Sequence, residues 1–330
     1  MTGGRQILAA PVRGARRTER ISISSPSDFL RGAEQSVERV TEIVLPYCLD
    51  FWRRRSIYVG GVDTRGAQAA PFYYLYLRRE ARSVVSVPWE SGSLAERTSH
   101  APIFLFSPGR CGSTLLSRIL SSSGTPNVSE PDFYTQATSA LAASPFNPLG
   151  RRMQQAIWNL GVDLAAALDP AAPPVVKLRA ESCRAPDLLW QPAERRTLFM
   201  TRGFETWARS TGRAFRNGPD KAVRKYLSAM TCYAWLRQYS ECHLLHYEDL
   251  LAAPLDTTQA LARFLGRDIA AAAVASTMKE DSQEGTPLGQ GMRADQPDWE
   301  KRFDATMALW NSARVRRVRG RLGVDELRTG

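Results

Sequence analysis

The chain has 330 residues, of which 43% are hydrophobic and 23% charged, an ordinary globular composition that suffices for one large α/β domain with or without an attachment. It contains no run of about 18 apolar residues, which argues against a membrane span. Residues 1–25 are basic and lack the long apolar stretch of a signal peptide, so we expect a flexible basic arm there. The five scattered cysteines form no C-x-x-C pair, which argues against a disulfide framework or a zinc site and favours a cytoplasmic location.

The formal net charge is +11, and most of the 44 basic residues are arginine. Arginine binds phosphate and sulfate groups through two parallel hydrogen bonds, so this charge favours anionic ligands. Much of this positive charge is also explained by its contribution to solubility, without any ligand. Nucleic acid has to be considered as a partner, but the basic residues are dispersed and no helix-turn-helix, zinc-finger or RNA-recognition signature is present. We therefore do not expect a nucleic-acid partner.

The first hundred residues differ in pattern from the rest of the chain. Residues 27–55 predict a helix, because Ser27 or Asp28 could cap it and apolar residues recur after them. Residues 56–89 are rich in β-branched and aromatic residues interrupted by Gly and Pro, which is typical of short antiparallel strands. Residues 26–100 are therefore predicted to form a small N-terminal α+β cap.

From residue 101 the chain alternates between buried strands and amphipathic helices. The segments "PIFLFS", "PPVVKLR", "RRTLFMTRG" and "CHLLHYEDL" are predicted strands, and helices are predicted after the first, third and fourth. This alternation predicts an α/β fold with a parallel sheet and helices on both faces, over residues 101–330. Ligands of such sheets bind beyond the carboxyl ends of the strands.

The loop of residues 107–114 lies between the first of these strands and its helix. Gly109 and Gly112 allow its backbone N–H groups to turn inward, and the helix N-terminus adds further donors. Arg110 adds a charge, and Ser113 and Thr114 add hydroxyls, so the loop is a candidate anion cradle. It lacks the lysine and the glycine spacing of a nucleoside triphosphate loop. The alternative is a glycine-rich turn that merely starts a helix.

Three segments together resemble the PAPS-dependent sulfotransferases, which use 3′-phosphoadenosine-5′-phosphosulfate (PAPS) as donor. "FLFSPGRCGSTLLSRIL" resembles their 5′-phosphosulfate loop, which is P-loop-like. "TLFMTRGFETWARSTGRAF" is similar to their 3′-phosphate site, and "LLHYEDLLAAPLDTTQALARFLG" to a third segment in the same order. The resemblance covers about residues 101–266.

The resemblance implies a metal-independent transfer of a sulfuryl group from PAPS to a hydroxyl or amine acceptor, with PAP as product. It places the 5′-phosphate on the loop and the 3′-phosphate on a strand-end arginine and a helix serine. It also implies that Arg110 stabilises the leaving group and that Lys177 contacts the sulfuryl group. The implied donor-binding residues are Arg110, Cys111, Gly112, Ser113, Thr114, Arg202 and Ser210.

An acceptor hydroxyl must lose a proton, so a general base is required. We expect Glu130 to be this base, because related enzymes that sulfate carbohydrate or tyrosine place a glutamate at a similar distance after the loop. Asp132 is the second candidate. The three histidines are less suitable, since His100 precedes the first strand and His243 and His246 lie in a buried strand pattern.

Several points stay open at the level of the sequence. Arg179 could bind donor or acceptor, and the segment around Arg293 resembles the family's C-terminal donor segment only loosely. Tyr247, Glu248 and Asp249 are interpreted as structural. The acceptor is a small molecule, glycan or peptide, and a homo-oligomer is not excluded. The alternative functions are a P-loop small-molecule or nucleotide kinase, and a non-catalytic protein that binds anions or nucleic acid.

Overall fold

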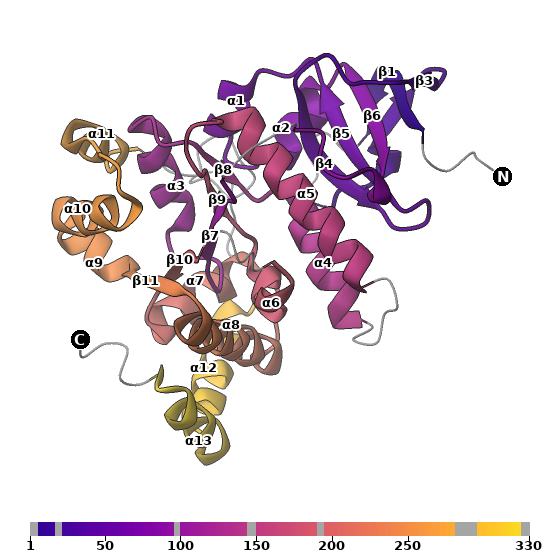
Figure 1. Ribbon diagram of the computed structural model, residues 1–330. Helices are drawn as coiled ribbons and strands as arrows, with labels where there is room; N and C mark the ends of the chain where they lie inside the picture. Colours follow the sequence, from indigo (N-terminus) through magenta and orange to yellow (C-terminus); the bar gives the residue numbers. More distant parts are fainter. Residues whose placement is uncertain are drawn as a thin grey trace. The chain divides into compact units, whose positions relative to one another are not determined.

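The computed structural model describes residues 6–16, 22–95, 100–143, 150–189, 195–280 and 296–324 (Figure 1). The chain forms two compact units. The first unit comprises Met1–Phe104 and Gly124–Arg195, and the second comprises Leu105–Ser123 and Arg196–Gly330.

An antiparallel sheet fills the N-terminal part of the first unit. Its order is β2-β1-β6-β5-β4, and β3 pairs with β1. Central strand β5 is buried along its whole length, so that both faces of the sheet are covered there. The six strands are β1 (Ile7–Ala15), β2 (Phe29–Arg31), β3 (Gln35–Val37), β4 (Val44–Asp50), β5 (Arg55–Gly60) and β6 (Ser83–Pro88).

Three local predictions for this region are wrong. Residues 7–15, expected in a flexible arm, form β1, which is held by backbone pairing with β6 and β3. The helix expected at 27–55 is replaced by the 3-10 turn η1 (Pro26–Asp28) and strands β2 to β4, because β4 is buried on both faces and its continuous apolar run carries no period of two. The segment around Tyr73–Glu80, expected as a strand, is helix α2, in which the buried residues include two pairs four positions apart, Tyr73 with Leu77 and Tyr74 with Arg78.

A second sheet contains five strands in the order β11-β10-β7-β9-β8. Strands β10 and β11 are parallel, as are β8 and β9. This parallel sheet is flanked by helices and confirms the α/β fold class, whereas the domain boundary placed near residue 100 stays a prediction. The strands are β7 (Ile103–Phe106), β8 (Asn127–Ser129), β9 (Val175–Lys177), β10 (Arg196–Thr201) and β11 (Glu241–His246).

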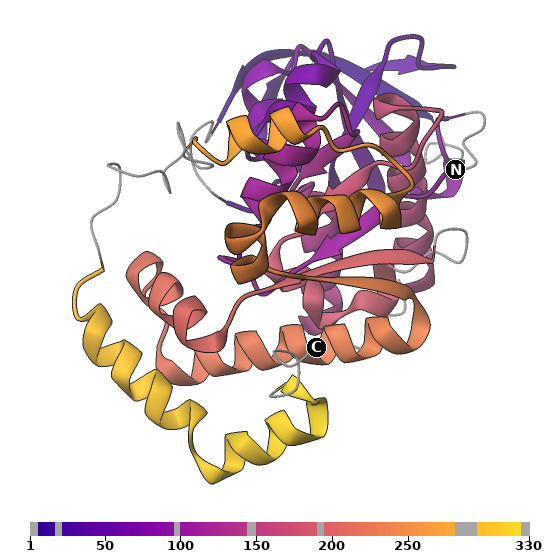
Figure 2. The same cartoon turned by 90° about the vertical axis from the view of Figure 1, so that its left-hand side faces the viewer.

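Helices pack within each unit. In the second unit, α12 lies along α7 and α8 (Figure 2), and the ring of Phe204 stacks on that of Trp310 with centroids 3.6 Å apart. The first unit has α1 (Thr64–Ala69), α2, α4 (Asp132–Ala143), α5 (Gly150–Leu168), α6 (Pro186–Leu189) and the 3-10 helices η2 (Trp89–Ser91) and η3 (Ala180–Arg184). The second has α3 (Ser113–Ser122), α7 (Phe204–Ala214), α8 (Pro219–Tyr239), α9 (Tyr247–Ala252), α10 (Pro254–Leu265), α11 (Ala271–Thr277), α12 (Trp299–Trp310) and α13 (Ala313–Leu322).

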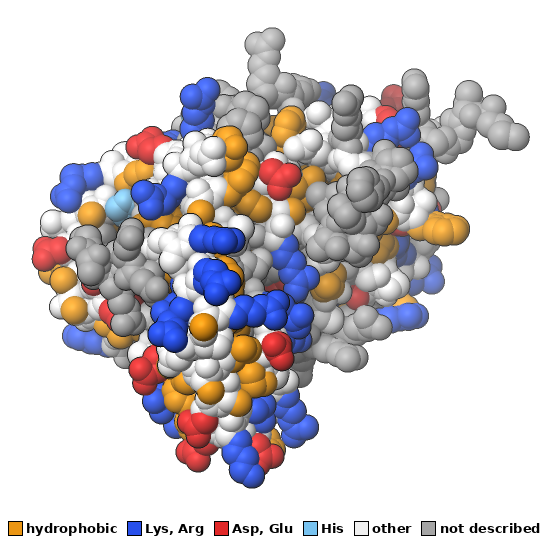
Figure 3. All heavy atoms as spheres, turned by 90° about the horizontal axis from the view of Figure 1, so that it is seen from below, with side chains coloured by type: hydrophobic (Ala, Val, Ile, Leu, Met, Phe, Trp, Pro, Cys, Tyr) orange, Lys and Arg blue, Asp and Glu red, His pale blue; other side chains and the backbone are white. Residues whose placement is uncertain are grey.

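The positive charge is visible at the surface. Figure 3 shows a face on which Lys and Arg side chains are numerous and lie among apolar and acidic ones. Helix α13 has no acidic residue and exposes four arginines, at positions 314, 316, 317 and 321. Within the described ranges, no helix has both the length and the apolar character that crossing a bilayer requires.

Candidate active site

The loop between β7 and α3 has an unusual backbone. Gly109, Arg110 and Gly112 all lie in the left-handed region, with φ of 75°, 58° and 83°. Such a sequence of conformations turns backbone N–H groups toward one side and forms a concave anion site. Helix α3 starts at Ser113, and its N-cap position is Gly112, which has no side chain to bond the first N–H groups. The loop thus combines three positive φ angles with a helix start that has no side-chain cap, and its role as an anion cradle stays a prediction.

The loop is hydrogen-bonded to residues in the core of the second unit. The indole Nε1 of Trp207 donates to the carbonyl oxygen of Gly109 at 2.7 Å. The thiol of Cys111 is buried and donates to the carbonyl oxygen of Met200 at 3.3 Å. The Cys111 side chain thus faces the core, and its predicted role in donor binding rests on its backbone N–H.

Gly112 packs so closely on Tyr247 that a Cβ at this position would overlap the tyrosine ring. We expect Gly112→Ala to lower the free energy of unfolding by about 1–2 kcal/mol through its left-handed backbone and by about 1–3 kcal/mol more through overpacking. Denaturant unfolding would measure this loss. Gly124→Ala is the matched control, since Gly124 has φ of 72° but no neighbour within 4 Å of the added Cβ. Equal losses in the two variants would contradict close packing on Tyr247.

The predicted donor-binding residues outside the loop lie on β10 and α7. The Nε of Arg110 donates to the hydroxyl of Ser210 at 3.4 Å, so the structure brings these two together. Arg202 follows β10, donates from Nε to the Thr206 hydroxyl at 3.1 Å, and lies over the Tyr247 ring with its guanidinium carbon 4.6 Å from the ring centroid. The second unit therefore places two arginines and a serine hydroxyl around the loop and the start of α7.

Tyr247 and Glu248 take a larger part in this region than the sequence indicated. Tyr247 contacts both the loop, at Gly112, and Arg202. The Oε1 atom of Glu248 accepts hydrogen bonds from the backbone N–H of Gly203 at 3.0 Å and from the Thr206 hydroxyl at 3.1 Å. These contacts agree with the interpretation of the "YEDL" motif as structural, and they extend it to the loop and to Arg202.

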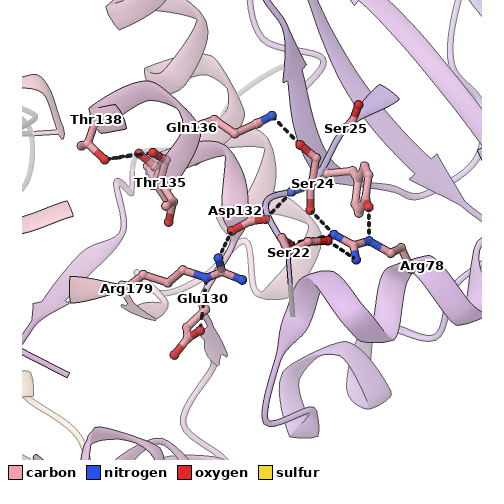
Figure 4. A network of polar contacts seen from close by, with 12 residues as sticks. Ser22, Ser24, Ser25, Arg78, Glu130, Asp132, Thr135, Gln136, Thr138 and Arg179 are labelled. Carbon is pink, nitrogen blue, oxygen red and sulfur yellow. Dashed lines mark hydrogen bonds and ion pairs between the residues drawn. The ribbon is translucent and has the colours of Figure 1, made fainter. Parts of the chain in front are cut away.

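A second cluster, in the first unit, surrounds Glu130. Lys177 donates from Nζ to Oε1 of Glu130 at 2.9 Å and to the Ser129 hydroxyl at 3.0 Å. The Nε of Arg179 lies 3.3 Å from the other carboxylate oxygen of Glu130 (Figure 4). Glu130 itself precedes Pro131 and has φ of 64°, a costly conformation for a residue with a side chain. Two predicted catalytic residues, Glu130 and Lys177, are therefore in direct contact.

Asp132 belongs to the same cluster but is deeper. Its Oδ1 lies 3.2 Å from Nη1 of Arg179, and its side chain is 0% exposed, compared with 17% for Glu130. Burial raises the pKa of Asp132, although Arg179 acts in the opposite direction. Burial lowers the pKa of the Arg179 guanidinium, but the negative charges of Asp132 and Glu130 together outweigh burial, so the pKa is raised. Arg179 is thus a buried cation held between two carboxylates.

The remaining candidates lie elsewhere. His243 is half-buried and stacks on Phe264 with centroids 5.0 Å apart, and this partial burial lowers its pKa. Arg293 lies outside the described residues. In the part of the chain that the structure covers, no group of three or more His, Cys, Asp or Glu side chains is arranged to hold a metal ion.

No family model and no curated protein matches the chain. Solved structures with a related fold do match. The sulfotransferase domain from the curacin biosynthetic pathway is 16% identical over 69% of this chain and 99% of that one, with a TM-score of 0.41. The sulfotransferase STF9 from Mycobacterium avium is 10% identical over 71% and 78%, with a TM-score of 0.43. A retinol dehydratase in complex with androsterone and the inactive cofactor PAP is 13% identical over 69% and 80%, with a TM-score of 0.37. Two of these three structures are sulfotransferases by name, and the third is a retinol dehydratase with PAP bound.

Proposed function

We propose that the protein transfers a sulfuryl group from PAPS to a hydroxyl or amine acceptor, with Glu130 as general base and Arg110 stabilising the leaving group. The observation that carries this proposal is backbone strain. Among the residues that the structure describes, the non-glycine residues with positive φ are Arg54, Arg110, Glu130 and Asp298. Two of these four are the residues that the sequence predicts to be catalytic. Strained backbone persists where the surrounding structure enforces it, and such positions cluster at functional sites.

In the proposed reaction, the oxygen of the acceptor attacks sulfur in line with the leaving phosphate. The new bond between acceptor oxygen and sulfur forms as the bond between sulfur and the bridging phosphate oxygen breaks, and PAP leaves with the electron pair. Catalysis of this kind depends mainly on positioning and on stabilising charge. The loop N–H groups and the hydroxyls of Ser113 and Thr114 would hold the 5′-phosphate. Arg110 would neutralise charge on the bridging oxygen.

The 3′-phosphate is assigned to Arg202 and Ser210. Arg202 is supported by its position over Tyr247 and by its hydrogen bond to Thr206. Ser210 is supported by its contact with Arg110, since a hydroxyl can accept from the arginine while donating to a phosphate oxygen.

Glu130 is assigned as the group that takes up the proton of the acceptor. Asp132, the second candidate, is fully buried and paired with Arg179, so it has no surface on which to meet an acceptor. Glu130 keeps a partly exposed carboxylate that Lys177 and Arg179 hold in one orientation. In this proposal Lys177, which is 4% exposed, also contacts the sulfuryl group as it transfers.

Thermal unfolding with and without excess PAP tests the donor assignment, with ATP and Mg²⁺ as the comparison. A ligand at about 100 times its Kd stabilises a protein by roughly 2.7 kcal/mol, which raises Tm by a few degrees. We expect the rise with PAP and not with ATP and Mg²⁺. A rise with ATP and Mg²⁺ alone would favour the kinase alternative, which the lack of a lysine in the loop opposes.

The exposed arginines of α13 favour one alternative function, the binding of nucleic acid without catalysis. A shift of RNA or DNA by the protein in about 150 mM salt, together with no effect of PAP, would favour that function. We also propose a reducing, cytoplasmic location, which all five cysteines support by being free thiols.

A further inference from the structure

A short segment of the N-terminal region, Ser22–Ser25, reaches the Glu130 cluster. The backbone N–H of Ser24 donates to Oδ2 of Asp132 at 2.5 Å. In return, Nε2 of Gln136, one turn further along α4, donates to the carbonyl oxygen of Ser24 at 2.8 Å. Figure 4 shows Asp132 between this segment on one side and Arg179 on the other.

The segment is anchored by a buried ion pair between helix α2 and turn η1, and Tyr47 of strand β4 joins this pair. The Nε of Arg78 lies 3.2 Å from Oδ2 of Asp28, and these side chains are 0% and 1% exposed. The Tyr47 hydroxyl donates to Asp28 at 2.6 Å. Nη2 of Arg78 donates to the carbonyl oxygen of Ser22 at 3.1 Å and to the Ser24 hydroxyl at 3.3 Å. Residues 22–24 are therefore fixed by a charged group that water does not reach.

Beyond Asp132 the contacts continue to Glu130. Arg179 forms ion pairs with Asp132 through Nη1 and with Glu130 through Nε, so one guanidinium links the two carboxylates. The ring of Tyr74, 4.3 Å from the guanidinium carbon, supports Arg179 from its flat face. Three cations, Arg78, Lys177 and Arg179, balance three carboxylates, Asp28, Asp132 and Glu130.

We infer that Asp132 is a positioning residue for Glu130, supported by residues 22–25, so that the N-terminal sheet contributes to the proposed reaction through Arg179. This inference rests on the proposed function, because it gives the cluster a purpose in proton transfer. Stability alone explains the arrangement poorly, since buried ion pairs are often no more stabilising than apolar residues of the same volume. A group that must hold a catalytic carboxylate within about 0.5 Å has a reason to be charged and buried.

The test compares Asp132→Asn with the wild-type protein by two measurements. The first is the exchange rate of the Arg179 Nε–H proton by ¹⁵N NMR, with the signal assigned by its loss in Arg179→Lys. It needs neither donor nor acceptor. We expect exchange to be at least about 10-fold faster, because asparagine removes the charge that fixes the guanidinium. The second is kcat with PAPS and any accepted substrate, expected to fall about 10-fold or more with the affinity for PAP unchanged.

Asp163→Asn is the matched control, because Asp163 is also a buried aspartate of the first unit and accepts hydrogen bonds from Tyr58, Ser93 and the backbone N–H of Ala95. It is expected to cost stability without changing Arg179 exchange or kcat. Ser24→Ala, a milder variant, loses the hydroxyl that accepts from Arg78 and should change both measurements in the same direction but less. Ser27→Ala, an exposed serine of the same region, should change neither.

The outcomes separate the inference from the proposed function. Faster exchange with a lower kcat in Asp132→Asn, and neither change in Asp163→Asn, supports the inference. An unchanged exchange rate overturns it, and so does faster exchange with an unchanged kcat. If the wild-type protein transfers no sulfuryl group to any acceptor, the proposed function fails and the inferred catalytic role of Asp132 fails with it, whereas the exchange measurement still decides whether Asp132 holds Arg179.

Discussion

Replacing Glu130 by Gln is expected to lower kcat for sulfuryl transfer by about 10²- to 10⁴-fold, the usual contribution of a general base. Glutamine has nearly the same size and still accepts a hydrogen bond from Lys177, so the cluster should stay folded. It cannot take up the acceptor proton. Steady-state rates with PAPS, combined with calorimetric titration of PAP, would show a loss of turnover with an unchanged Kd for PAP.

Glu241→Gln is the control for this prediction, because Glu241 is an exposed glutamate at the start of β11. It should leave both turnover and PAP binding unchanged. An equal loss of PAP affinity and of turnover in Glu130→Gln would show that Glu130 binds the donor, and the assignment as base would be wrong. Full activity in Glu130→Gln would have the same consequence.

The second large effect is expected for Arg110→Ala. Removal of one group that stabilises charge in a transition state costs about 10²- to 10³-fold in kcat. A hydrogen bond to a charged group contributes about 1.5–3 kcal/mol, so we also expect PAP to bind roughly 10- to 100-fold more weakly. Arg110→Lys keeps the charge but lacks the planar guanidinium that could contact Ser210 and a phosphate together. Its kcat and its affinity for PAP should therefore lie between those of the wild-type protein and those of Arg110→Ala.

Arg118→Ala provides the comparison on the helix that follows the loop, since Arg118 lies on α3 and pairs with Glu280 at 3.6 Å. Pairs near the surface contribute little, about 0–1 kcal/mol, so this variant should bind PAP and turn over as the wild type does. Loss of turnover in Arg110→Ala with an unchanged Kd for PAP would show that Arg110 stabilises the transition state but does not contribute to PAP binding. Unchanged turnover would remove it from the mechanism.

Together, the two variants test the two proposed groups of residues separately. Arg110 lies in the second unit on the loop that we propose to bind the donor, and its loss should affect both binding and turnover. Glu130 lies in the first unit among paired charges, and its loss should affect turnover alone. The contrast between the two results is therefore more informative than either result by itself.

The sequence by itself determined the class of the fold and the location of the glycine-rich loop between β7 and α3. Continuous apolar runs such as Ile103–Phe106 predict buried parallel strands, and β7, β9, β10 and β11 lie where they were expected. The loop could be recognised because glycines, an arginine and two hydroxyl residues before a helix are a local pattern, and their backbone geometry depends mainly on neighbours in the chain. Glu130 and Lys177 were also named from the sequence, without any indication that they touch.

The tertiary structure decided the N-terminal region. A strand buried on both faces, such as Val44–Asp50, has no period of two, so its apolar residues also fit a helix. Residues 7–15 became a strand only because partners lie at β6 and β3, and such pairing depends on residues far away in the sequence.

The tertiary structure also decided the charge network behind Glu130. The hydrogen bonds from Arg78 to Ser22 and from Ser24 to Asp132, and the ion pair between Asp132 and Arg179, join segments far apart in the chain. Buried charges need partners because water no longer solvates them, but no local pattern shows which partner each one finds. For this reason the sequence could name Asp132 only as a second candidate base, whereas its complete burial beside Arg179 supports a positioning role.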